Sequence, residues 1–231
     1  MKARPILFNG AMVRAILADN KTVTRRAIKH QPDVPVTDAI ARRECPHGPA
    51  TANWYWRPKH GHLNGMPSHG WDFQCPYGQV GDRLWVRETF MDLLGTGVEH
   101  RPDPSGPLQR YAYATECPPG SYADEARKDM GLKWKPSIHM PRAACRLELE
   151  IVAVRVERLQ VISRADIRAE GLVCPPELAS DDVSPNYRDW YPAAFRELWE
   201  STGGDWVGNP WVWVVEFRRV LPEAMAATVA A

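Results

Sequence analysis

A long stretch of alternating apolar and charged residues constrains the fold more than any other part of this chain. Leu147, Leu149 and Ile151 share one parity, with charged residues between them. From Val152 onward the apolar residues take the other parity, as far as Val156. Because successive side chains of a strand point to opposite faces, this pattern predicts one long strand with a bulge or bend near Val152. Barrels use such bends to turn corners.

Shorter patterns predict the elements around this strand. Runs of apolar and aromatic residues predict further strands at 5–8, 84–88, 111–113 and 211–217. The last of these should be buried on both faces, because apolar residues occupy nearly every position. Apolar residues at helical spacing predict three short helices, over 11–18, from Ser163 to Glu170, and around 191–199. Gly171 and the Gly203-Gly204 pair end the last two helices. These elements predict an α+β fold, a small mixed barrel with helices outside it.

Two long segments interrupt the pattern. Residues 30–78 and 91–140 are rich in Pro and Gly and show no sustained period beyond the short strand at 111–113. We interpret both segments as insertions in a single domain spanning residues 1–222. Loops of this length usually form functional sites or are disordered. Aromatic residues of the first segment would either stack on bases or fasten the loop to the body. The Ala-rich tail, 223–231, is predicted to be disordered.

Composition limits the function classes. The net charge of +1 gives no global drive toward nucleic acid or an anionic membrane, although residues 1–43 carry nine Lys/Arg against three Asp. That basic end would either meet a phosphate or sit in water. No apolar run approaches the roughly 20 residues that a membrane helix needs. We therefore expect a cytoplasmic protein without membrane contact.

The cysteines predict no disulfide framework, since all five are scattered and form no C-x-x-C pair. One Cys/His-rich loop raises zinc as an alternative, because its side chains are of the type that zinc binds. Their spacing matches no zinc-finger pattern, and we expect neither a metal nor a cofactor. The residues concerned are Cys45, His47, His60, His62, His69 and Cys75.

The densest chemistry lies between Lys21 and Arg26, in the sequence Lys-Thr-Val-Thr-Arg-Arg. It directly follows the predicted helix 11–18. A turn at residues 20–22 that leads into a strand from Val23 would place Thr24 and Arg26 on one face and bring Lys21 toward Thr24. A solvated basic loop is the ordinary alternative.

The order of these motifs resembles the ASCH domain, a member of the PUA-like superfamily of β-barrels. The resemblance covers under half of the chain and implies a PUA-like β-barrel. In chain order, the matching pieces are Ile16 to Arg26, Gly81 to Val86, Arg158-Leu159 with Ala169-Glu170, and Trp213 to Phe217.

The resemblance also implies an activity. Small enzymatic ASCH proteins are amidohydrolases that remove the acyl group from N4-acetylcytidine and related N4-acylcytidines. Carried onto this chain, their catalytic set becomes Lys21, Thr24 and Glu170, without metal, and Glu88 is the competing carboxylate. The substrate would be a small modified cytidine nucleoside, with RNA as a further partner. We expect substrate-binding roles for Arg26, Asn9, Glu88, Ser137, His139 and Arg142.

Two mechanisms remain open. Lys21 would deprotonate Thr24 to form an acyl-threonine, or Lys21 or Glu170 would activate water directly. A lysine base needs a lowered pKa, which burial and Arg26 would favour and a charged Glu170 would oppose. Two rival functions use the same cleft: a non-catalytic module that binds RNA or a modified base, and an ASCH-type ribonuclease. The acyl group preferred and the oligomeric state are open as well.

Overall fold

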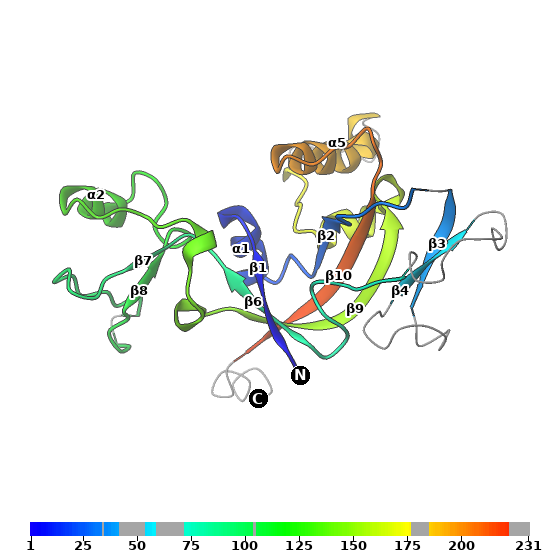
Figure 1. Cartoon of the computed structure of the whole chain (residues 1–231). Helices are drawn as coiled ribbons and strands as arrows, with labels where there is room; N and C mark the ends of the chain where they lie inside the picture. Colours follow the sequence, from blue (N-terminus) through cyan, green and yellow to red (C-terminus); the bar gives the residue numbers. More distant parts are fainter. Residues whose placement is uncertain (34, 42–53, 59–71, 104, 177–184, 222–231) are drawn as a thin grey trace, which may run out of the picture. The chain divides into compact units, whose positions relative to one another are not determined.

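The computed structural model describes residues 1–33, 35–41, 54–58, 72–103, 105–176 and 185–221, and its fold is α+β (Figure 1). The chain forms two compact units, which are described separately. Unit 1 comprises Met1–Asp19, Arg83–Glu150 and the segment from Arg219, and unit 2 comprises Asn20–Asp82 and Ile151–Arg218. The single domain expected from the sequence stays a prediction. No described helix combines the length and hydropathy required to cross a membrane.

Unit 1 contains three neighbouring strands. β1 (Ala3–Leu7) runs parallel to β6 (Arg83–Arg87), and β6 pairs antiparallel with the first residues of β9 (Glu148–Arg158). The inward parity of β6 carries Leu84 and Val86, both almost completely buried. Helix α1 (Gly10–Leu17) follows β1 and buries Val13 and Ile16, as its spacing predicted.

The second part of unit 1 contains one predicted strand and several elements that the sequence patterns did not predict. β7 (Phe90–Asp92) pairs with β8 (Tyr111–Tyr113), so the short strand predicted at 111–113 is confirmed. Helix α2 (Tyr122–Asp129) and two 3-10 turns, η2 (Ser137–His139) and η3 (Arg142–Ala144), complete it. Its apolar clusters are small: Phe90, Tyr113, Met140 and Ala144 form one, and Met91, Leu93 and Ala112 the other.

Unit 2 is built around β10 (Trp211–Val220), which lies between β9 and β2 (Val23–Ala27). β10 and β2 are antiparallel, with Val214 opposite Arg25 and Val215 opposite Thr24. Residues 211–215 are all buried, which confirms the prediction of a strand covered on both faces.

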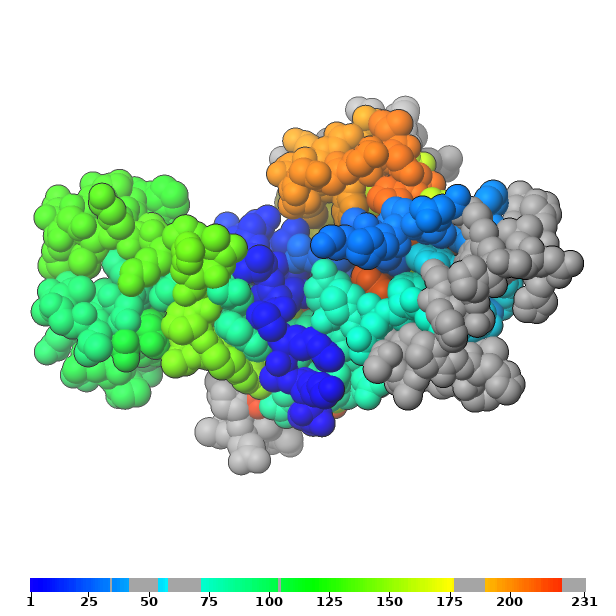
Figure 2. All heavy atoms as spheres, viewed as in Figure 1, coloured from blue at the N-terminus to red at the C-terminus, as the bar shows by residue number. Residues whose placement is uncertain are grey.

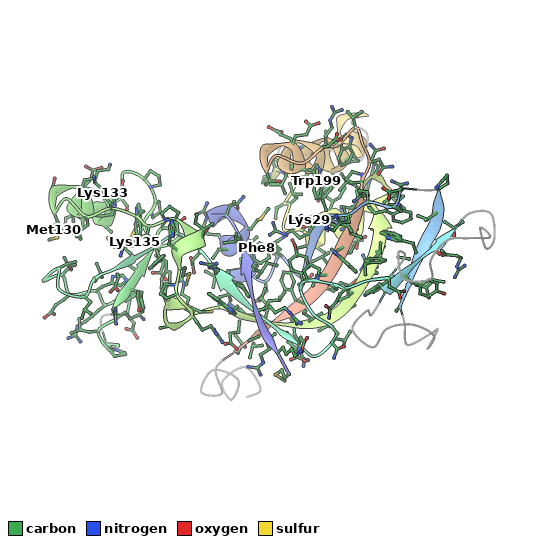
Figure 3. All side chains as sticks on the ribbon, viewed as in Figure 1. Phe8, Lys29, Met130, Lys133, Lys135 and Trp199 are labelled. Carbon is green, nitrogen blue, oxygen red and sulfur yellow. The ribbon has the colours of Figure 1, made fainter. Side chains whose placement is uncertain are left out.

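Helices cover one face of this sheet. η4 (Leu159–Val161) leads to α3 (Arg164–Ala169), and α5 (Pro185–Ser201) follows later in the chain. Trp199, labelled in Figure 3, belongs to the side of α5 that packs on the sheet, and α5 itself, orange in Figure 2, forms part of the surface of unit 2. The buried cluster of this face comprises Val23, Leu159, Ile167, Cys174, Tyr191, Phe195, Trp199, Val212 and Val214.

Aromatic residues cover the other face. β3 (Val36–Ala41), β4 (Trp54–Pro58) and β5 (Asp72–Phe73) form a three-stranded antiparallel sheet. Trp54 meets Trp213 with ring centroids 5.6 Å apart, and Trp56 meets Trp211 at 5.3 Å. The expectation of an irregular segment over 30–78 was therefore wrong for its described part. The signal was missed because each strand is short, and cross-strand aromatic packing rather than a long period stabilises the sheet.

The expected closed barrel is not confirmed, because in neither unit do the described strands close into a ring. The predicted disordered tail, 223–231, lies outside the described residues. So do five of the six residues of the alternative zinc site; only Cys75 is described, and it is buried.

Candidate active site

The site begins where the entry to β2 meets the end of α3. Lys21 and Glu170 form an isolated antiparallel bridge, and the Thr22 amide donates to the Ala169 carbonyl at 2.8 Å. These main-chain contacts join two segments about 150 residues apart in the chain. They hold the backbones of the two segments together without any side-chain contact.

Lys21 is a buried amine with three acceptors. Its Nζ donates to the carbonyl of Val23 at 2.9 Å, to the carbonyl of Glu170 at 2.8 Å and to Glu170 Oε2 at 2.6 Å. The side chain of Lys21 is 0% exposed and that of Glu170 4%. An ammonium has three N–H donors, so these contacts use its full capacity.

Burial sets the proton affinity of this amine. Desolvation lowers the pKa of Lys21 below its ordinary 10.5; the carboxylate of Glu170 opposes this, and the charges of Arg26 and Arg25 add to it. The net direction is downward, as the proposed base requires. The tension between burial and Glu170 that the sequence indicated is therefore decided by burial.

α3 presents Glu170 to this lysine. The helix is capped by Ser163, where the sequence predicted its start, and Ser163 Oγ accepts the amide of Asp166 at 3.1 Å. Glu170 is the C-cap residue, and Gly171 follows with φ of 92°, a left-handed conformation that glycine adopts without strain. The second carboxylate oxygen of Glu170 lies 3.7 Å from Arg25 Nη1.

Thr24 and Arg26 share one face of β2, as predicted, and it is opposite to the face of Arg25, which faces Glu170. Lys21 Nζ donates to Val23 and Glu170, so the expected contact between Lys21 and Thr24 stays a prediction. The register places Thr24 beside Val215 and Arg26 beside Trp213 of β10, so both belong to the face that carries the aromatic cluster. Thr24 is only 2% exposed. Burial raises the pKa of Tyr77, and the charge of Arg26 opposes that shift, so Tyr77 belongs to the surroundings of Arg26.

The remaining predicted site residues belong to unit 1. Glu88 is 1% exposed and is held by Arg146, whose Nε and Nη2 donate to its two oxygens at 2.9 and 3.1 Å, and by the Thr115 hydroxyl at 2.8 Å. Asn9 caps α1, with Oδ1 accepting the Met12 amide at 2.9 Å. Both side chains therefore have structural contacts within unit 1. Glu170 is the carboxylate that contacts Lys21 within unit 2.

Three of the residues expected to bind substrate lie in short turns of unit 1. Ser137 and His139 lie in η2, and Arg142 begins η3, where its guanidinium pairs with Glu148 and lies 5.6 Å from the ring centroid of Trp85. Ser137, His139 and Arg142 belong to unit 1, whereas Lys21, Thr24 and Glu170 belong to unit 2. Their substrate-binding roles stay predictions.

Sequence reasoning missed Arg25. Arg25 was not among the predicted site residues, yet its side chain is 0% exposed and ion-paired with Glu157 and Asp166. Strand parity was the available signal, since Arg25 alternates with Thr24 and Arg26 and must therefore point to the helix-covered face. In the described part of the chain, no group of three or more His, Cys, Asp or Glu side chains is arranged to hold a metal ion.

Comparison with known proteins adds little to this geometry. No family model matches the chain, and no curated protein matches it. Among solved structures, a crystal structure of an ASCH domain from Lactobacillus crispatus JV V101 is similar, at 10% identity over 94% of this chain and 79% of that chain, with a TM-score of 0.33. A similarity of this size carries no argument about activity or detailed fold, so membership of the ASCH family remains a proposal.

Proposed function

We propose that the chain hydrolyses the exocyclic amide of an N4-acylated cytosine nucleoside, with Lys21, Thr24 and Glu170 as the reacting groups. The observation that carries the proposal is the buried contact of 2.6 Å between Lys21 Nζ and Glu170 Oε2. These two residues are 149 positions apart in the chain, and the motif resemblance implies a catalytic role for both. A buried amine of lowered pKa beside a carboxylate can act as a general acid/base pair.

The pair can supply both proton transfers of the reaction. Within the short contact, the proton on Lys21 Nζ moves to Glu170 Oε2, which leaves a neutral amine and a neutral acid. This route requires Thr24 Oγ1 to come within reach of Lys21 Nζ, which in the structure donates to Val23 and Glu170. The amine then takes the Thr24 hydroxyl proton while Oγ1 attacks the acyl carbon, and the acid protonates the cytosine nitrogen as the C–N bond breaks. The products are free cytosine amine and an acyl-threonine, and the pair is again charged.

The second half repeats this cycle. The amine of Lys21 takes a proton from water as the water oxygen attacks the acyl-threonine, and Glu170 returns a proton to Thr24 Oγ1 as the carboxylic acid leaves. In the alternative route, water attacks the amide directly and Thr24 only orients the carbonyl. Both routes need the same pair. They differ in whether a covalent intermediate forms.

The aromatic and cationic neighbours of Thr24 support a nucleobase as the group bound. Arg26 shares its face with Trp213, and Tyr77 belongs to the surroundings of Arg26. Planar rings and guanidinium groups are common partners of bases. The PUA-like β-barrel, the ASCH family and the cytoplasmic location belong to the same proposal, and they rest on the motif resemblance and the composition.

The test is direct. The purified full chain is incubated with N4-acetylcytidine and chelator, and cytidine and acetate are quantified by chromatography. Lys21→Met, Thr24→Val and Glu170→Gln should each lose at least about 100-fold in kcat/KM, within the range that general acid/base catalysis contributes. Arg158→Gln is the matched control, because Arg158 contacts Asn209 and Trp211 instead of this pair. A wild type without turnover, or a Lys21→Met variant of full activity, would refute the proposal.

One observation favours a second candidate, a module that binds the modified base without chemistry. All three donors of Lys21 are engaged by protein oxygens, as in a static ion pair that locks α3 onto β2. In that case N4-acetylcytidine should bind in calorimetry and be recovered unchanged. Acyl-threonine detected by mass spectrometry after rapid quenching would exclude this module and also identify the covalent route.

A further inference from the structure

The strongest unassigned feature is a buried charged network on the helix-covered face of unit 2. Arg25 lies at its centre, because the register places it opposite Val214, whose side chain belongs to the apolar cluster under α3 and α5. Arg25 Nη2 donates to Asp166 Oδ2 at 2.8 Å and to Glu157 Oε2 at 3.2 Å. The mechanism described above does not use Arg25.

Arg25 spans one side of α3 from start to end. Asp166 and Glu170 are four residues apart and so lie on the same side of the helix. Arg25 contacts Asp166 through Nη2 and faces Glu170 Oε1 through Nη1, at 3.7 Å. The carboxylate of Glu170 is therefore bracketed, with Lys21 at one oxygen and Arg25 at the other.

A second arginine supports this arrangement from β9. Arg155 Nη2 donates to Asp166 Oδ1 at 3.0 Å, and its Nε donates to Glu157 Oε1 at 2.5 Å. Arg155 also pairs with Glu216 of β10. Asp166 and Glu157 thus each bind both arginines, which ties the orientation of the Arg25 guanidinium to three elements of the sheet and to α3.

We propose that Arg25 is a positioning residue for the Lys21–Glu170 pair, which it holds in register by binding α3 at Asp166 and facing the outer oxygen of Glu170. The expected effect of Arg25 on catalysis rests on the proposed function. The positioning of Lys21 and Glu170 by Arg25 does not depend on it. A planar fork of donors suits this position, because Nη2 binds Asp166 and Glu157 while Nη1 faces Glu170, and the compact ammonium of lysine has no second nitrogen to span these carboxylates.

The positive charge of Arg25 also predicts an effect on Lys21. Lys21 is faced by Glu170 from the end of α3 and by Arg25 and Arg26 from β2, and both arginines lower its pKa. Removing the charge of Arg25 relieves this repulsion and leaves Glu170 to interact with Lys21 alone. Both effects raise the pKa of Lys21, so the fraction of neutral amine falls at a given pH.

The experiment compares Arg25→Gln and Arg25→Lys with wild type in the full chain, and Arg158→Gln is again the matched control. Lysine is labelled with ¹³C at Cε, and the Lys21 signal, assigned by its loss in Lys21→Met, is titrated by NMR. Activity on N4-acetylcytidine and the thermal midpoint are measured on the same samples. The titration needs no turnover, so it tests the role of Arg25 even if the hydrolase proposal fails.

We expect Arg25→Gln to move the Lys21 midpoint to higher pH and to lower kcat by about tenfold or more with little change in KM, since reacting groups misplaced by about 1 Å lose rate on this scale. Arg25→Lys should keep the midpoint closer to that of wild type, because it keeps the charge, while kcat still falls. The inference is overturned if both Arg25 variants leave the Lys21 midpoint and kcat as in Arg158→Gln and lower only the thermal midpoint.

Discussion

The prediction that most directly probes the buried pair is the loss of stability in Lys21→Met. The substitution keeps an unbranched side chain that is one atom shorter and removes the three hydrogen bonds, so the Glu170 carboxylate, whose side chain is 4% exposed, loses its closest cation. Breaking a buried ion pair from one side costs about 3–5 kcal/mol. Arg25 remains 3.7 Å from the other oxygen, which places the expected loss near the lower end, about 3 kcal/mol.

For a chain of this size, about 3 kcal/mol corresponds to a fall in Tm of about 6–12 °C. Tryptophan fluorescence during thermal and urea unfolding is a suitable assay. Trp85 and Trp134 are the two of the ten tryptophans that belong to unit 1, so the signal reports mainly on unit 2. The double variant Lys21→Met/Glu170→Met should recover part of the loss, because replacing both partners of a buried pair by apolar side chains is often neutral. A single variant as stable as wild type, or losses that add in the double variant, would refute a buried and energetically coupled pair.

The pH dependence has a defined sign. Burial lowers the pKa of Lys21 in the folded protein below 10.5, and unfolding restores it. Between these two values the unfolded chain binds more protons than the folded chain, so the free energy of unfolding rises with pH in that window. Lys21→Met should abolish the rise. Denaturant midpoints measured between neutral pH and pH 10.5 would contradict the assignment if wild type and variant change in parallel.

Three further perturbations test the packing around the site. Ser163→Ala removes the acceptor of the Asp166 amide at the start of α3 and should cost about 1 kcal/mol, a fall of about 2–4 °C in Tm, whereas a Tm equal to that of wild type would deny this cap a role. Phe195→Ala empties a position that is 2% exposed in the cluster under α5 and should cost about 3–5 kcal/mol in urea unfolding; Val207→Ala, at a position 81% exposed, is the control that should change little. In unit 1, the hydrogen bond from Arg110 lowers the pKa of Asp92 to about 2. The contribution of Asp92 to the free energy of unfolding is therefore present above pH 3.8 and is lost as the pH falls toward 2. Asp92→Asn should remove that part of the acid sensitivity, and identical acid titrations of wild type and variant by circular dichroism would contradict this.

Local patterns predicted the elements that depend on neighbouring residues. The cap at Ser163, the left-handed glycine at 171 and the one-sided apolar spacing of Tyr191, Phe195 and Trp199 all follow from contacts within a turn or two of helix. The alternation of β2 placed Thr24 and Arg26 on one face for the same reason. Such features need no information about distant parts of the chain.

The strands β3, β4 and β5 escaped prediction because their stability is not local. Each is short, and the aromatic side chains of β4 and β5 acquire their role only when they pack against Trp211 and Trp213 of β10.

The sequence by itself named candidate site residues and predicted which way side chains point along their own elements. Parity and helical spacing follow from backbone geometry, which any chain obeys. Only the tertiary structure decided that Lys21 meets Glu170, that Glu88 is held by Arg146, and that Arg25 is buried in the charged network. These contacts join segments far apart in the chain, and burial, which fixes the proton affinity of Lys21, arises only when the sheet and α3 pack together.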